Sequence, residues 1–200
     1  MRAADELHRV SAELFVWQLY EPSVKAELTA CAVLEAGELI LIDPLPLAPE
    51  VLQELTGYGR PSTVVLTNGN HERATELYRK KFGVRVVASA GAAAELETAP
   101  DELLEEGMLV NGVLEVHSME GAGPGEIALL GKSGSLHFGD AVIHLPEHGF
   151  SLLPEKYCTD AKQMRESLRK LLRLDFTLLT FAHGLPIVTR ARDQLAQLLA

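Results

Sequence analysis

The sequence predicts an α/β (α+β) protein with a single domain over residues 1–200, built as a four-layer αββα sandwich. In this fold two β-sheets pack face to face and helices cover both outer sides. Short apolar stretches that predict strands occur in two groups along the chain, and helical patterns follow each group. No linker, low-complexity segment or shift in composition separates the two groups, and 200 residues suit one well-buried domain.

In the first half, apolar stretches separated by turn residues predict strands at 13–20, 28–34, 38–42, 63–66 and 84–88. Helices are expected at 50–55, 73–82 and 91–96. Ala36-Gly37 predicts a hairpin turn, three prolines predict a loop over 44–49, and Gly83 is a suitable helix stop.

In the second half, strands are expected at 112–116, 127–130, 135–138 and 176–181. An amphipathic helix is expected at 161–172, because Met164, Leu168 and Leu171 recur at helical spacing. A last helix over 189–199 completes the predicted fold.

The overall composition excludes several classes of partner. The formal net charge of −10 argues against nucleic acid and against an anionic membrane surface. The first ten residues lack the apolar core of a signal peptide, and no apolar run approaches a membrane span. Cys31 and Cys158 are too few for a disulfide framework or a zinc knuckle, and Cys31 is expected to be a small buried side chain. A cytoplasmic protein is therefore expected.

One polar loop lies between a predicted strand and a predicted helix, a position where functional residues are common in α/β folds. Residues 67–73 read Thr-Asn-Gly-Asn-His-Glu-Arg, between the predicted strand 63–66 and the predicted helix 73–82. The segment resembles the Thr-His-x-His-x-Asp-His loop of the metallo-β-lactamase superfamily, which binds two zinc ions. In this comparison Asn68 and Asn70 stand at the first two histidines, Glu72 at the aspartate and Arg73 at the third histidine.

Four further segments resemble landmarks of the same family, in the same order along the chain. They are Leu41-Ile42-Asp43-Pro44, Gly121-Ala122-Gly123-Pro124-Gly125, Leu136-His137-Phe138-Gly139-Asp140 and Ala182-His183-Gly184. The resemblance covers roughly residues 12–200 and implies a hydrolase-like fold in which these landmarks share one cleft. Ala122 stands where the second landmark of the family has a histidine.

The resemblance implies that the dinuclear zinc site is largely lost. Asn68, Asn70 and Ala122 remove the nitrogen ligands of one metal position. Glu72, Asp140 and His183 remain as candidate catalytic residues and ligands for the other. Two carboxylates and one histidine suit a single, weakly held zinc, iron or manganese ion, so the expected cofactor is one such ion or none.

Arg73 offers an alternative without metal. A guanidinium cannot be deprotonated, so Arg73 could neutralise Asp140 and Asp43 directly. The protein would then be a non-catalytic binding module whose cleft offers Asn68, Asn70 and Arg73 to a small anionic ligand. A second interpretation has Arg73 simply begin its helix and face solvent.

The remaining histidines give weaker signals. His71 is interpreted as a helix-start residue in preference to a stray ligand or proton carrier, although it lies in the candidate ligand-binding loop. His144 and His148 are candidates for a cleft rim, whereas His117 and His137 lie in strand patterns and are expected to be structural. No serine-nucleophile elbow occurs, and no Cys–His pair can be placed.

Overall fold

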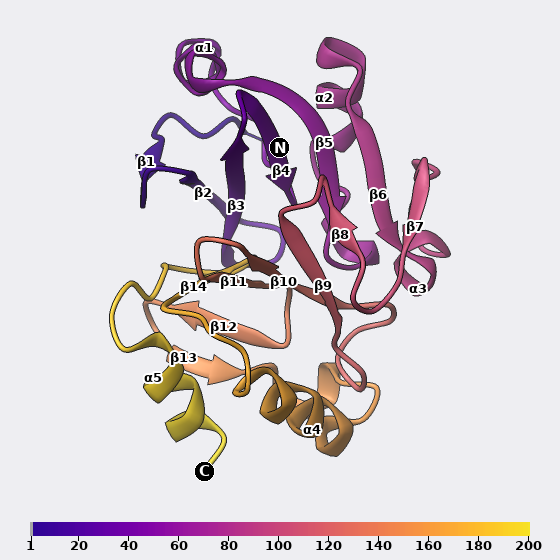
Figure 1. Ribbon diagram of the computed structural model, residues 1–200, viewed down its shortest axis with the longest axis vertical. Coiled ribbons are helices and arrows are strands. Elements are labelled where there is room, and N and C mark those ends of the chain that lie inside the picture. The colour runs from indigo at the N-terminus through magenta and orange to yellow at the C-terminus, as the bar shows by residue number, and fades with distance from the viewer. Residues whose placement is uncertain (1) are drawn as a thin grey trace.

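The computed structural model describes residues 2–200 and contains two large β-sheets (Figure 1). The first sheet has seven strands in sequence order: β1 (His8–Arg9), β2 (Leu14–Glu21), β3 (Ala26–Glu35), β4 (Glu38–Ile42), β5 (Arg60–Leu66), β6 (Arg85–Ser89) and β7 (Glu102–Leu104). Strands β1 to β4 pair antiparallel, and β4 to β7 pair parallel. The sheet is therefore mixed.

The second sheet has five strands, in the order β14 (Leu178–Phe181), β11 (Ser135–Phe138), β10 (Ile127–Gly131), β9 (Leu114–Ser118) and β8 (Leu109–Val110). A separate hairpin is formed by β12 (Val142–Leu145) and β13 (Gly149–Leu152). The α-helices are α1 (Pro49–Tyr58), α2 (Thr75–Phe82), α3 (Ala90–Ala93), α4 (Ala161–Leu171) and α5 (Ala191–Leu198). Two short 3₁₀ helices are η1 (Gly69–His71) and η2 (Glu155–Tyr157).

The buried apolar residues form three clusters. Because side chains alternate between the two faces of a strand, neighbouring residues of one strand can belong to different clusters. In β2, Phe15 and Trp17 join the cluster that contains buried residues of α1 and α2. Leu14 and Val16 point the other way, into a cluster shared with residues of β9 and β10. The third cluster joins β11 and β14 to α4 and α5. The expectation of a mixed α/β fold is confirmed.

Several local expectations differ from the structure. Helix α2 begins at Thr75 and not at residue 73, because Arg73 has a positive φ of 44°, outside the helical region. The β12–β13 hairpin was not predicted, and it carries His144 on its first strand and His148 in its turn. Within residues 2–200, no helix is both long enough and apolar enough to cross a membrane.

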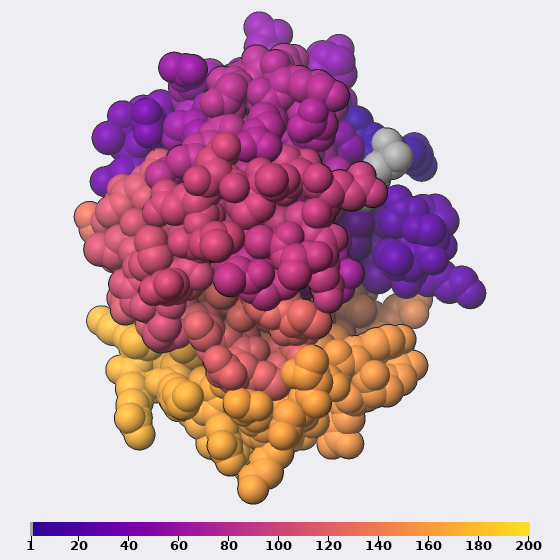
Figure 2. Space-filling model, turned by 90° about the vertical axis from the view of Figure 1, so that its right-hand side faces the viewer, coloured from indigo at the N-terminus to yellow at the C-terminus, as the bar shows by residue number. Residues whose placement is uncertain are grey.

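The strand ends bring distant parts of the chain together. Strand β4 runs parallel to β5, so Asp43 and Thr67 emerge at the same edge of the first sheet. Strand β11 runs parallel to β14, so Asp140 and His183 emerge together from the second sheet. The amide of Thr29 on β3 donates to the carbonyl of Ala182 (2.8 Å) and ties these two edges to each other. Figure 2 shows the indigo and magenta N-terminal half stacked on the orange and yellow C-terminal half.

Candidate metal centre

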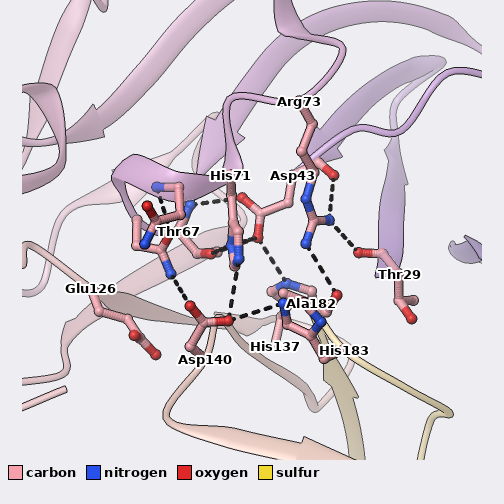
Figure 3. Close-up of polar contacts among 12 residues, drawn as sticks. Thr29, Asp43, Thr67, His71, Arg73, Glu126, His137, Asp140, Ala182 and His183 are labelled. Carbon is pink, nitrogen blue, oxygen red and sulfur yellow. Dashed lines mark hydrogen bonds and ion pairs between the residues drawn. The ribbon is translucent and has the colours of Figure 1, made fainter. Parts of the chain in front are cut away.

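Asp43 is the innermost residue of the site, and its side chain is fully buried. Oδ1 accepts a hydrogen bond from the Thr67 amide (2.8 Å), and Oδ2 accepts one from the Thr67 hydroxyl (2.5 Å). Nδ1 of His71 lies 2.9 Å from the same Oδ2 (Figure 3). Asp43 also has a positive φ of 48°, a conformation that costs free energy in residues other than glycine and that often marks functional sites.

His71 lies between two carboxylates. It ends η1, a 3₁₀ turn that Asn68 caps by accepting the Asn70 amide hydrogen (3.0 Å). This turn directs the imidazole inward, with Nδ1 at Asp43 and Nε2 at 3.2 Å from Oδ1 of Asp140. The preferred interpretation of His71 as a helix-start residue is therefore wrong, because the ring is buried within the site.

Asp140 and His183 complete the group from the second sheet. Nε2 of His183 lies 3.2 Å from the Asp140 oxygen that His71 also approaches. Nδ1 of His183 donates to the carbonyl of Glu27 (3.2 Å), and Nδ2 of Asn68 donates to the other Asp140 oxygen (3.0 Å). One ligand atom each from His71, Asp140 and His183 lies within 4.8 Å of the others, which is close enough to share a metal ion.

The charges in this group are strongly coupled. Burial alone would lower the pKa of His71, but the carboxylates of Asp140 and Asp43 outweigh burial and the repulsion from Arg73 and raise it to about 9. Burial alone would raise the pKa values of the two carboxyls, but His71 above all holds both well below their usual range. Without metal, the site therefore holds an imidazolium between two carboxylates at neutral pH.

Glu72 lies outside this group. Its carboxylate accepts the backbone amides of Glu97 (2.7 Å) and Thr98 (2.8 Å), in the segment that follows α3. Successive side chains in a 3₁₀ turn differ in direction by about 120°. Because His71 points inward, the next residue, Glu72, points away from the site. The structure thus brings together His71, Asp140 and His183, whereas the sequence predicted Glu72, Asp140 and His183.

Arg73 matches neither of its predicted roles. Its guanidinium donates to three main-chain carbonyls, those of Thr29 (2.7 Å), Asp43 (3.0 Å) and Ala182 (3.2 Å). In residues 2–200 it forms no ion pair with a carboxylate within 4 Å, so the predicted direct pairing with Asp140 or Asp43 is absent. It does not face solvent at a helix start either, because it connects Thr29, within β3, to the residues that directly follow β4 and β14.

The other residues of the loop have different positions. Asn68 is buried and binds Asp140, whereas Asn70 is exposed. Ala122 is buried and packs in the apolar cluster of the second sheet. None of these three residues offers a free ligand of the kind that zinc prefers: the amide of Asn68 is already used by Asp140, the amide of Asn70 is neutral and exposed, and Ala122 has only a methyl group.

A cavity of about 550 Å³ opens onto the group. It is lined by Glu21, Ser23, Val24, Leu28, Asn70, His71, Arg73, Asp140 and His183. His144 and His148, the predicted rim residues, do not line it. Nδ1 of His144 instead contacts the carbonyl of Leu185 (2.7 Å).

Two buried residues near the site carried no functional prediction. Glu126 follows the glycine-rich loop and accepts the amide of Ala141 (2.5 Å), and burial, with the nearby charge of Asp140, raises its pKa to about 8. In the sequence, the charged residue directly before the apolar strand was the signal that could have indicated Glu126.

His137 lies 3.4 Å from the sulfur of Cys31, so a Cys–His pair does exist. Both residues are buried, as expected for Cys31, and they line no cavity described above.

The structure is thus an α/β protein whose two sheets meet at a histidine–aspartate–histidine group with the spacing of possible metal ligands. The sequence profile described as metallo-beta-lactamase superfamily matches residues 4–200, and the chain belongs to this superfamily. No curated protein matches the sequence.

Solved structures of metallo-beta-lactamases share the fold. DIM-1 metallo-beta-lactamase, in a crystal exposed to ceftazidime, is 15% identical with a TM-score of 0.79, over 100% of this chain and 98% of its own. The enzyme from Pontibacter korlensis is 17% identical with a TM-score of 0.76, over 97% and 98%. BLEG-1 B3 metallo-beta-lactamase is 18% identical with a TM-score of 0.70, over 92% and 100%. At these identities the likeness extends to the fold alone.

Proposed function

We propose that this protein is a hydrolase-like member of the superfamily that binds one divalent metal ion through His71, Asp140 and His183. The observation that carries the proposal is the convergence of the two Nε2 atoms on one oxygen of Asp140, at 3.2 Å each. Ligands held about 2.0–2.2 Å from zinc lie roughly 3–3.5 Å from one another. The two distances to Oδ1 of Asp140 therefore already have the spacing of a coordination shell, and all three ligand atoms lie within 4.8 Å of one another.

The second nitrogen of each histidine supports this assignment. Metal-binding histidines usually donate their other N–H to a carboxylate or a backbone carbonyl, which fixes the tautomer. His71 directs Nδ1 at Asp43, and His183 directs Nδ1 at the carbonyl of Glu27. With both protons on Nδ1, both Nε2 lone pairs face the shared position. Asn68 binds one oxygen of Asp140, so the other oxygen remains available to the shared position.

A metal ion at this position would supply Lewis-acid activation of a water or a carbonyl oxygen. The chain itself supplies the cavity, whose apolar wall includes Val24 and Leu28 and whose polar rim includes Asn70. Its size suits a small substrate, and an ester, thioester or amide is the expected class. Zinc, iron and manganese all tolerate two histidines and a carboxylate.

A non-catalytic binding module is the second candidate, and one observation favours it. Both carboxylates have a cationic contact without a metal, because the His71 imidazolium contacts Asp43 as well as Asp140. In this candidate His71 takes the role that the sequence analysis gave to Arg73. The ligand would be a small anion that enters the cavity beside Asn70 and Arg73.

Metal content distinguishes the two candidates. Protein purified without added metal is dialysed against chelator, titrated with zinc, manganese or ferrous iron, and measured by elemental analysis after desalting. We expect at most one equivalent, and an affinity that falls at least about 100-fold in His71→Ala and His183→Ala, because three protein ligands are the usual minimum for such a site.

Glu72→Gln is the matched control, because Glu72 is adjacent to His71 in sequence but points away from the group. It should bind metal like the parent. Two tightly held ions per chain, or a loss in Glu72→Gln equal to that in His71→Ala, would contradict the proposed site. Absence of binding by the parent for all three metals would favour the binding module.

A further inference from the structure

His137 is a buried ionisable residue that the proposed metal site does not use. On β11 its neighbours Leu136 and Phe138 belong to the cluster packed against α4 and α5. Because side chains alternate along a strand, His137 points the opposite way, between the two sheets and toward β3. A histidine in such a place costs free energy unless its nitrogens have partners.

The partners of Nδ1 determine the tautomer. Nδ1 lies 2.9 Å from the hydroxyl of Thr180 and 3.4 Å from the thiol of Cys31. A hydroxyl and a thiol can both donate to a ring nitrogen, so Nδ1 can act as the acceptor. The neutral ring then carries its proton on Nε2, and a protonated ring carries one there as well.

Nε2 of His137 is buried without a hydrogen-bond partner among the described residues, and it faces Asp43. The distance to Oδ2 of Asp43 is 3.9 Å, too long for a hydrogen bond but short for an electrostatic contact in a buried site. This is the same oxygen that the Thr67 hydroxyl and Nδ1 of His71 approach. Three polar hydrogens therefore converge on one carboxylate oxygen beneath the candidate metal site.

We infer that His137 is a positioning residue that acts through Asp43 to hold the ring of His71 in the orientation that presents Nε2 to a metal. The inference rests on the proposed metal site for its consequence, although not for its geometry. With Nε2–H of His137 beside it, Oδ2 of Asp43 is held at the position where it faces Nδ1 of His71. This contact fixes the ring of His71 so that its Nε2 points toward Asp140 and the shared position.

Two substitutions separate the two ends of the imidazole. His137→Gln places an amide near the position of Nε2 and keeps a donor facing Asp43. His137→Asn places its amide near Nδ1, so it keeps the contact with Thr180 but loses the donor that faces Asp43. Both variants remove the ring and its packing, so a purely structural role predicts similar losses in both.

We expect zinc affinity, measured by competition with a chromophoric chelator, to fall roughly tenfold in His137→Asn and to stay within about threefold in His137→Gln. His117 provides the matched control, because it is the other buried histidine with an unpartnered Nε2, and its neighbours are Glu106 and Glu115. His117→Asn should not change zinc affinity. Equal affinities in the two His137 variants would overturn the inference.

A second readout does not depend on metal. In metal-free protein, the ¹H and ¹⁵N chemical shifts of the Nδ1–H group of His71 at fixed pH report its hydrogen bond to Asp43. The parent and His137→Gln should give the same Nδ1–H signal, whereas His137→Asn should shift it. If the parent binds no zinc, the proposed function fails, yet this spectrum still tests the inference. Identical His71 spectra in all three proteins would contradict it.

Discussion

The two sheets contribute to the site in different ways. The second sheet provides Asp140 and His183 at the positions where the family resemblance predicts them, two residues after β11 and two after β14. The first sheet provides Asp43 as expected, but the loop after β5 contributes His71 where Glu72 and Arg73 were predicted. Residues directly after a strand are positioned by the β-ladder, whereas the direction of a side chain in a 3₁₀ turn depends on where the turn begins and changes by about 120° per residue.

The same comparison separates the buried and the accessible ends of the charge network. Asp43, from the first sheet, is fully buried, and its carboxylate contacts the Thr67 amide, the Thr67 hydroxyl and Nδ1 of His71. In contrast, 21% of the Asp140 side chain is exposed. Removing one partner of a buried charged network leaves desolvated groups without compensation. An exposed partner can be replaced by water at smaller cost.

The largest predicted effect is therefore the loss of Asp43. Asp43→Ala should lower the free energy of unfolding by about 3–5 kcal/mol in metal-free protein, because it leaves the Thr67 amide and His71 without their acceptor. Asp140→Ala should cost clearly less. Urea unfolding of both variants in chelator measures the difference. Equal costs would show that the two carboxylates support the fold alike.

The sequence predicted most of the fold and about half of the site, for a physical reason. Hydrophobic alternation and turn residues located β2 to β6, and the resemblance to family landmarks located Asp43, Asp140 and His183 just after predicted strands. The orientation of His71, Glu72 and Arg73 depends on η1 and on the positive φ of Arg73, which no periodic pattern encodes. The polar cluster of Cys31 and His137 depends on packing between sheets, which the sequence of one strand does not reveal.

The second prediction concerns pH and again involves the loop of the first sheet. The folded-state pKa of His71, about 9, lies above the unfolded value near 6.5. Its contribution to stability is therefore fully present below about pH 6.5 and is lost as pH rises through 9. In metal-free protein this loss should be on the order of 3 kcal/mol.

Two other buried groups titrate in the same direction. The pKa of His137 is about 9, since Cys31 and Asp43 overcome the lowering by burial, and the raised pKa of Glu126 is about 8. As pH rises, the parent will thus lose more free energy of unfolding than His71 alone contributes. The difference between the parent and His71→Gln isolates the contribution of His71. Thermal unfolding from pH 6 to 9.5 measures both proteins. Parallel curves for the parent and His71→Gln would show that His71 is not the cation of this network.

The smallest predicted effect is also the sharpest test of how the two sheets are joined. Arg73 donates to carbonyls that follow or belong to strands of both sheets, those of Thr29, Asp43 and Ala182. Arg73→Ala should lower the free energy of unfolding by roughly 2–3 kcal/mol, because hydrogen bonds from charged donors contribute about 1.5–3 kcal/mol each and the side chain is partly exposed. Arg73→Lys should rescue little, because one ammonium cannot reach three carbonyls in this geometry.

A pair of double-mutant cycles then decides which cation serves the carboxylates. Because His71 contacts Asp140 at 3.2 Å and Arg73 forms no ion pair with it, the coupling energy of His71 with Asp140 should exceed that of Arg73 with Asp140. We expect about 2 kcal/mol for the first pair and less than about 1 kcal/mol for the second, measured by urea unfolding at pH 6.5. Residual coupling of Arg73 would reflect its charge acting at longer range. If the order were reversed, or if Arg73→Lys restored full stability, charge and not the three-carbonyl clamp would explain why an arginine stands at this position.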